Sequence, residues 1–81
     1  MPKILVVGGN GFLGSHLVDA LARNEGTSIR AFDMFGSGTH WNATGVEAFD
    51  GNFLNHDDVS RAVTGVDIVV HMLSTTDPAT A

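Results

Sequence analysis

The chain has 81 residues, room for one domain at most, and its 43% hydrophobic and 16% charged residues are typical of a globular protein. Its net charge of −5 and four scattered basic residues argue against a nucleic-acid or membrane-surface partner, because both surfaces select clustered Lys and Arg. Cysteine is absent, no apolar run approaches the ~20 residues that span a bilayer, and no signal-like stretch is present. We therefore expect a cytoplasmic protein without disulfides or a metal site.

The first two predicted elements are a strand and a helix. Lys3 to Val7 is a short apolar run rich in β-branched residues and bounded by glycines, which predicts a buried strand. From Phe12 to Asn24 the apolar period becomes that of a helix, and one apolar face is formed by Leu13, Leu17, Ala20 and Leu21. Ser15, Asp19 and Arg23 are then expected to face water.

The rest of the chain continues this alternation. We predict a strand over 28–33, a Gly-, Ser- and Thr-rich loop over 34–45, a strand over 46–49, a helix with Asn55 as its N-cap, and a buried strand over 67–73. Strands that alternate with crossovers pair in parallel through right-handed connections. The chain is therefore predicted to be a single α/β domain over residues 1–81 with strand order 3-2-1-4, the N-terminal portion of a Rossmann-type parallel sheet.

A glycine motif joins the first strand to the first helix. Gly9-Asn10-Gly11-Phe12-Leu13-Gly14 fits the pattern G-x-G-x-x-G, in which the first glycine permits a tight turn, the second lets the backbone approach a pyrophosphate, and the third lets helix and strand pack closely. Gly8 adds a second, overlapping spacing with Gly11 and Gly14. No Gly-Lys-Ser/Thr follows, which excludes a P-loop. The motif predicts a dinucleotide site, and a purely structural turn is the alternative.

An acidic residue stands where that motif requires one. Asp33 ends the second predicted strand, 19 residues after Gly14, and is predicted to accept hydrogen bonds from the adenosine ribose; a solvated strand end is the alternative. A carboxylate there repels a 2′-phosphate, and no Arg or Lys lies between Asp33 and Arg61 to offset it. The residues therefore favour NAD over NADP.

The ordered motifs resemble a known family. Gly8 to Leu17 (GGNGFLGSHL) looks like the opening of the extended short-chain dehydrogenase/reductases, and within them of the NAD-dependent epimerase/dehydratase family that acts on nucleotide sugars. The resemblance continues at Asp33, at Gly51-Asn52-Phe53, and over residues 65–72 (GVDIVVHM). It covers essentially the whole chain.

The resemblance implies cofactor-binding roles for particular positions. Gly8, Gly11, Phe12 and Leu13 would lie along the pyrophosphate, Asp33 at the adenosine ribose, Asn52 and the Phe53 backbone at the adenine edge, and Met72, Leu73 and Ser74 beside the nicotinamide-side ribose. Two departures stand out. The family usually has Asp at the position of Asn52, whose amide oxygen can still accept from the adenine amino group. It usually has small alanines at the positions of Leu73 and Ser74.

The family's catalytic residues have no counterpart in these 81 residues. Such enzymes use a Tyr-x-x-x-Lys pair, whereas this chain contains no tyrosine and its only lysine is Lys3. We therefore expect the N-terminal part of a nucleotide-sugar epimerase/dehydratase, without the catalytic portion and inactive alone. A non-catalytic NAD(P)-binding sensor and a reductase of a non-sugar ketone remain alternatives.

Two further features carry expectations about surfaces. The fourth strand would leave its outer edge unpaired and expose Ile68, Val69 or Val70, so we expect the isolated chain either to self-associate through that strand or to be an ordered part of a longer polypeptide. Trp41 lies in the polar loop. It either covers the adenosine or a partner surface, or anchors the loop itself.

Overall fold

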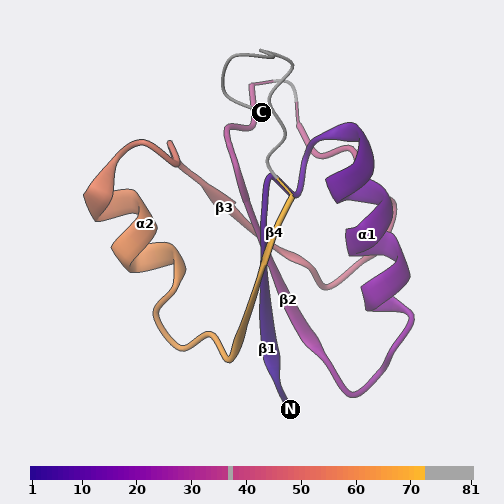
Figure 1. The fold of residues 1–81 in the computed structure, drawn as a ribbon. Helices are drawn as coiled ribbons and strands as arrows, with labels where there is room; N and C mark the ends of the chain where they lie inside the picture. The colour runs from indigo at the N-terminus through magenta and orange to yellow at the C-terminus, as the bar shows by residue number, and fades with distance from the viewer. Residues whose placement is uncertain (37, 73–81) are drawn as a thin grey trace.

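The structure is a computed structural model that describes residues 1–36 and 38–72. Its elements are β1 (Lys3–Val7), α1 (Phe12–Ala22), β2 (Ser28–Asp33), β3 (Glu47–Asp50), α2 (His56–Ala62) and β4 (Ile68–His71). The strands form one parallel sheet in the order β3-β2-β1-β4, with α1 on one face and α2 on the other (Figure 1). The predicted fold class and strand order are confirmed.

The sheet has a core on each face because β1 and β2 are covered on both sides. Along β1, Ile4 and Val6 face α1 and pack with Val18, whereas Leu5 and Val7 face the other side and pack with Ala62. In a strand that is buried on both faces, no side chain points to solvent, so apolar and polar residues do not alternate. For this reason every residue from Ile4 to Val7 is apolar. The same requirement makes these strands recognisable without a structure.

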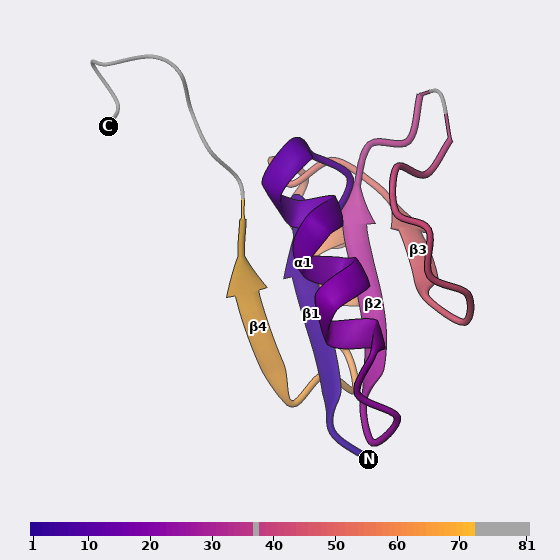
Figure 2. The same ribbon diagram turned by 90° about the vertical axis from the view of Figure 1, so that its right-hand side faces the viewer.

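The described residues of the connection from β2 to β3 form no helix. Residues 38–46, here called the crossover segment, run beside α1 on its face of the sheet (Figure 2). Trp41 is only 8% exposed and packs edge-on against Phe35, with ring centroids 5.6 Å apart. The indole thus contributes to the core where a crossover helix would otherwise pack, and Trp41 anchors its own loop.

Two residues of α1, Ser15 and Asp19, depart from the expected water-facing stripe. Ser15 is buried, and its hydroxyl donates to the Phe12 carbonyl oxygen at 3.1 Å. Asp19 is half-buried because its Oδ1 accepts the N–H groups of Asn42 and Ala43, at 2.9 and 2.8 Å. Arg23 is exposed as expected, and the helix ends just before it. The polar face of α1 therefore holds the crossover segment as well as facing solvent.

The second half of the chain differs from the predictions in its boundaries and its burial. Asn55 caps α2 as predicted, its side chain accepting from the Asp58 N–H at 3.0 Å. β3 lies one residue later than predicted and β4 is shorter. The expectation of a buried fourth strand is wrong: Ile68 (48%), Val69 (52%) and His71 are exposed and Val70 is half-buried, because β4 lies at the edge of the sheet beyond α1 (Figure 2). Within the described residues, no helix is long and apolar enough to cross a membrane.

Candidate functional site

The turn from β1 into α1 is built on three glycines. Gly8 has φ +82°, and its carbonyl oxygen accepts the Gly11 N–H at 3.2 Å. A Cβ on Gly14 would lie 2.0 Å from that same oxygen, so only glycine lets the helix begin this close to the strand. The close-packing role of Gly14 is therefore correct.

The tight turn, however, belongs to Gly8 and not to Gly9. Gly9 has no left-handed φ, and it is required for a different reason: a Cβ there would lie 2.7 Å from the Ala31 Cβ on β2. The governing spacing is thus Gly8-x-x-Gly11-x-x-Gly14. Both spacings are present in the sequence, and only the backbone geometry distinguishes them.

The amino end of α1 is open at this turn. Gly11 is the N-cap residue in an extended conformation, and it has no side chain with which to cap the helix. The N–H groups of the first turn have no partner within a helix, so they present the positive end of the helix dipole. A Cβ on Gly11 would have Gly8 O, at 3.5 Å, as its nearest described neighbour. The backbone at Gly11 is therefore accessible, as close approach of an anion requires.

Asp33 lies at the carboxyl end of β2, beside the glycine turn. Its Oδ2 accepts the Asn10 N–H at 2.9 Å and its Oδ1 accepts the Met34 N–H at 2.8 Å. The carboxylate is half-buried and oriented by the backbone on both sides, unlike a freely solvated strand end. Among the described residues no cation forms an ion pair with it.

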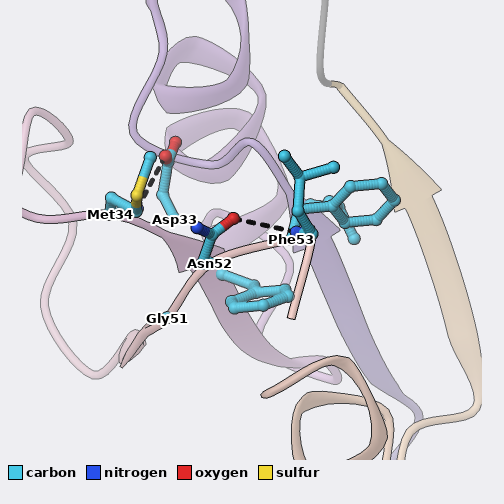
Figure 3. A pocket seen from close by; sticks show the side chains of 8 residues that line it. Asp33, Met34, Gly51, Asn52 and Phe53 are labelled. Atoms are coloured by element: carbon cyan, nitrogen blue, oxygen red, sulfur yellow. Dashed lines mark hydrogen bonds between the residues drawn. The ribbon is translucent and has the colours of Figure 1, made fainter. Parts of the chain in front are cut away.

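A pocket of about 230 Å³ lies next to Asp33 (Figure 3). It is lined by Val7, Phe32, Asp33, Met34, Gly51, Asn52, Phe53 and Leu54. The walls are predominantly apolar, and the polar side chains of Asp33 and Asn52 come from the end of β2 and from the segment after β3. A flat apolar ring with polar edges fits such a lining.

The Asn52 side chain is already used within its own turn. Its Oδ1 accepts the Leu54 N–H at 2.8 Å, and its backbone N–H donates to Asp58 Oδ2 at 2.9 Å. The amide oxygen retains one lone pair and the amide nitrogen its two donors. One lone pair of the Asn52 amide oxygen is therefore left to accept from an adenine amino group, and that role stays a prediction.

The structure gathers most of the predicted site residues at one edge of the sheet. Asp33 is the last residue of β2, and the others follow the carboxyl end of β1 or β3: Gly8, Gly11, Phe12, Leu13, Asn52 and Phe53. Met72 follows β4, where its N–H donates to Val7 O at 2.7 Å. Leu73 and Ser74 lie outside the described residues. In open parallel sheets, ligands bind at this edge, where neighbouring connections diverge.

Sequence reasoning gave no site role to five of the eight pocket residues: Val7, Phe32, Met34, Gly51 and Leu54. Met34 and Leu54 have exposed apolar side chains, and each directly follows a residue with a predicted site role. Met34 is an apolar residue one position beyond a strand end, and that is the signal that would have identified it.

The charges at the opposite edge are paired. Glu47 Oε1 on β3 contacts Lys3 Nζ at 2.9 Å and Arg30 Nε at 3.1 Å. The hydrogen bond from Lys3, assisted by Arg30, holds the pKa of Glu47 below its usual value. Arg30 also donates to the Ala62 and Thr64 carbonyl oxygens at the carboxyl end of α2. These cations therefore stabilise the fold at a distance from Asp33.

Two curated proteins are similar to this chain in sequence. UDP-glucuronic acid decarboxylase 1 of Danio rerio is 37% identical over 81 residues, covering 94% of this chain and 18% of its own length. The 3-beta-hydroxysteroid dehydrogenase of Mycolicibacterium neoaurum is 36% identical over 77 residues, covering 93% and 20%. The chain thus spans about a fifth of the length of these curated relatives.

A solved structure and a family model agree with these relatives. The UDP-glucuronic acid 4-epimerase of Bacillus cereus, in complex with UDP-glucuronic acid and NAD, superimposes with a TM-score of 0.69 at 29% identity, covering 86% of this chain and 26% of that one. Residues 4–80 match the model of the NAD dependent epimerase/dehydratase family, and the chain therefore belongs to that family.

Proposed function

We propose that this chain is the NAD-binding segment of a nucleotide-sugar epimerase or dehydratase. The observation that carries the proposal is the meeting of three features at one sheet edge: an open helix N-terminus, an accessible Gly11 backbone, and the oriented Asp33 carboxylate. Together they match the pyrophosphate and the ribose of a dinucleotide.

The residues present fit such a cofactor along its length. The pyrophosphate would lie against residues 11–13, whose N–H groups and helix dipole favour an anion. Asp33 would accept from the adenosine ribose through its remaining lone pairs, and the pocket beside Asn52 and Phe53 would take the adenine. Met72 would lie on the nicotinamide side. When bound, the nicotinamide supplies reversible hydride acceptance from a substrate carbon.

NAD rather than NADP is the proposed cofactor because of charge. A 2′-phosphate would bring about two negative charges to the Asp33 carboxylate, and no described cation pairs with that carboxylate. Like charges placed together in this way cost about 1–3 kcal/mol, or roughly five- to 150-fold in affinity.

Two other functions have separate support. The 36% identity to a 3-beta-hydroxysteroid dehydrogenase is close to the 37% identity to a sugar-nucleotide decarboxylase, and it favours a reductase of a non-sugar ketone as the second candidate. The absence of tyrosine from these residues keeps a non-catalytic NAD(P) sensor as the third. A Tyr-x-x-x-Lys sequence in the same polypeptide would exclude the sensor.

Calorimetric titration with NAD and with NADP tests the proposal. Gly11→Val should abolish binding while leaving the fold intact, because a Cβ at this position meets no described atom closer than 3.5 Å but would occupy the space against the pyrophosphate. Gly36→Val is the matched control, since no described atom lies within 4 Å of a Cβ there. A parent chain that binds neither dinucleotide, or a Gly11→Val chain that binds NAD as well as the parent, would refute the proposal.

A further inference from the structure

We infer that Asn10 is a positioning residue that sets the selectivity for NAD over NADP, by holding the crossover segment closed against the glycine turn beside Asp33. The inference rests on the proposed function, because it concerns the ribose end of the same site. It assigns a role to a residue that the glycine motif leaves unspecified.

Asn10 is a buried polar residue, and each of its four polar atoms has a hydrogen-bond partner. It is 8% exposed, and its backbone N–H donates to Asp33 Oδ2 at 2.9 Å. Its side-chain Nδ2 donates to Gly38 O at 2.9 Å, and its Oδ1 accepts the His40 N–H at 2.7 Å. The His40 ring Nδ1 donates to the Asn10 carbonyl oxygen at 2.7 Å. One residue therefore connects the glycine turn, β2 and the crossover segment.

The turn itself does not need asparagine at this position. Residue 10 has no positive φ, so the backbone conformation admits any small L residue. The side-chain contacts to Gly38 and His40 are thus the specific contribution of asparagine. Burying an amide side chain is unfavourable unless its groups are satisfied, which makes the pairing of residue 10 with residues 38 and 40 obligatory.

These contacts place the crossover segment at the carboxylate that would discriminate between the cofactors. Asn10 donates its N–H to Asp33 Oδ2 while its side chain bonds to residues 38 and 40, so this end of the segment is linked to Asp33 Oδ2 through Asn10. The other oxygen of Asp33 is held by the Met34 N–H. Turning the carboxylate away from a 2′-phosphate would break both bonds, and opening the segment would break the Asn10 contacts.

The far end of the crossover segment is attached independently. Asp19 Oδ1 accepts from Asn42 and Ala43, and Trp41 is buried against Phe35. A substitution of Asn10 detaches residues 38 and 40 of the crossover segment, and a substitution of Asp19 detaches residues 42 and 43. Only the substitution of Asn10 removes side-chain contacts of a residue that is bonded to Asp33.

The experiment measures dissociation constants for NAD and NADP in the parent chain, in Asn10→Ala and in the control Asp19→Ala. Losing the two side-chain hydrogen bonds of Asn10 should weaken NAD binding about three- to tenfold and reduce the NAD-to-NADP preference by a similar factor. Asp19→Ala should shift the emission of Trp41, the only tryptophan, and leave the cofactor preference unchanged. In the parent without ligand, the His40 amide should already be protected from hydrogen exchange.

The possible failures are distinguishable. A parent that binds neither dinucleotide refutes the proposed function. A parent that binds NAD, together with an Asn10→Ala chain of unchanged preference, refutes the role of Asn10 alone. Equal loss of preference in both variants would mean that loop attachment in general is responsible, which also overturns the assignment. Rapid exchange of the parent His40 amide overturns it without any variant, including the case in which Asn10→Ala does not fold.

Discussion

Replacing Gly14 with alanine tests whether the glycine turn is held by close packing of backbone against backbone. The added Cβ would lie 2.0 Å from Gly8 O, 2.9 Å from Gly8 C and 3.1 Å from Gly9 Cα. None of these atoms belongs to a flexible side chain, so the turn or the start of α1 must move. The substitution should therefore damage both stability and the geometry of the site.

The magnitude follows from two opposing effects. Overpacking costs typically about 1–3 kcal/mol, and a clash with rigid backbone belongs at or above the upper end of that range. Alanine has a higher helix propensity than glycine, which stabilises the helix by about 1 kcal/mol. The net loss should be about 2 kcal/mol or more, out of the roughly 4–12 kcal/mol expected for a domain of this size. For so small a domain, this lowers Tm by about 10 °C or more.

Thermal unfolding followed by circular dichroism measures this loss, with Gly36→Ala as the control. No described atom lies within 4 Å of a Cβ on Gly36, so alanine there should change stability by less than about 0.5 kcal/mol. If Gly14→Ala unfolds within about 0.5 kcal/mol of Gly36→Ala, the close contact with Gly8 does not exist in solution and the reasoning is wrong.

Three further predictions concern charge and the open edge. Asp33→Asn should narrow the NAD-to-NADP preference several-fold in calorimetric titrations, and an unchanged ratio would show that the carboxylate charge does not discriminate. Glu47 has a lowered pKa, so its stabilisation is complete above its ordinary value of 4.5 and is lost as pH falls through the lower folded value. Because Glu47 is 47% exposed, Glu47→Gln should cost at most about 1 kcal/mol at pH 7, and the Tm difference from the parent should shrink at acid pH rather than persist. The exposed Ile68 and Val69 on β4 predict that this chain self-associates through that edge; Val69→Lys should reduce the sedimenting mass, and a parent that is monomeric at every concentration would contradict this.

Much of the architecture was predictable because its causes are local. The run Ile4–Val7 is apolar at every position, as a strand covered on both faces must be, and Asn55 carries its capping oxygen next to the helix it starts. Alternating strands and crossovers leave few parallel topologies, so the strand order followed as well. The placement of Asp33 beside the glycine turn is a consequence of that order.

The errors lie where residues distant in sequence meet. Gly8 and Gly9 both satisfy a glycine spacing, and the choice between them depends on φ at Gly8 and on the approach of Ala31 from β2. Ser15 and Asp19 were assigned to solvent from the helical period alone. The helical period depends only on residues within the helix, so it gives no sign that Asn42, 23 residues later, donates its N–H to Asp19.

The pocket and the contacts of Asn10 were likewise decided only by the tertiary structure. Asn10 is an unspecified position of a glycine motif, and its partners Gly38 and His40 lie 28 and 30 residues away. Hydrophobic period and capping act within a few residues and leave a trace in the local sequence. Burial and hydrogen-bond partnership across the chain depend on where the sheet brings each segment, and that placement exists only once the strands have paired.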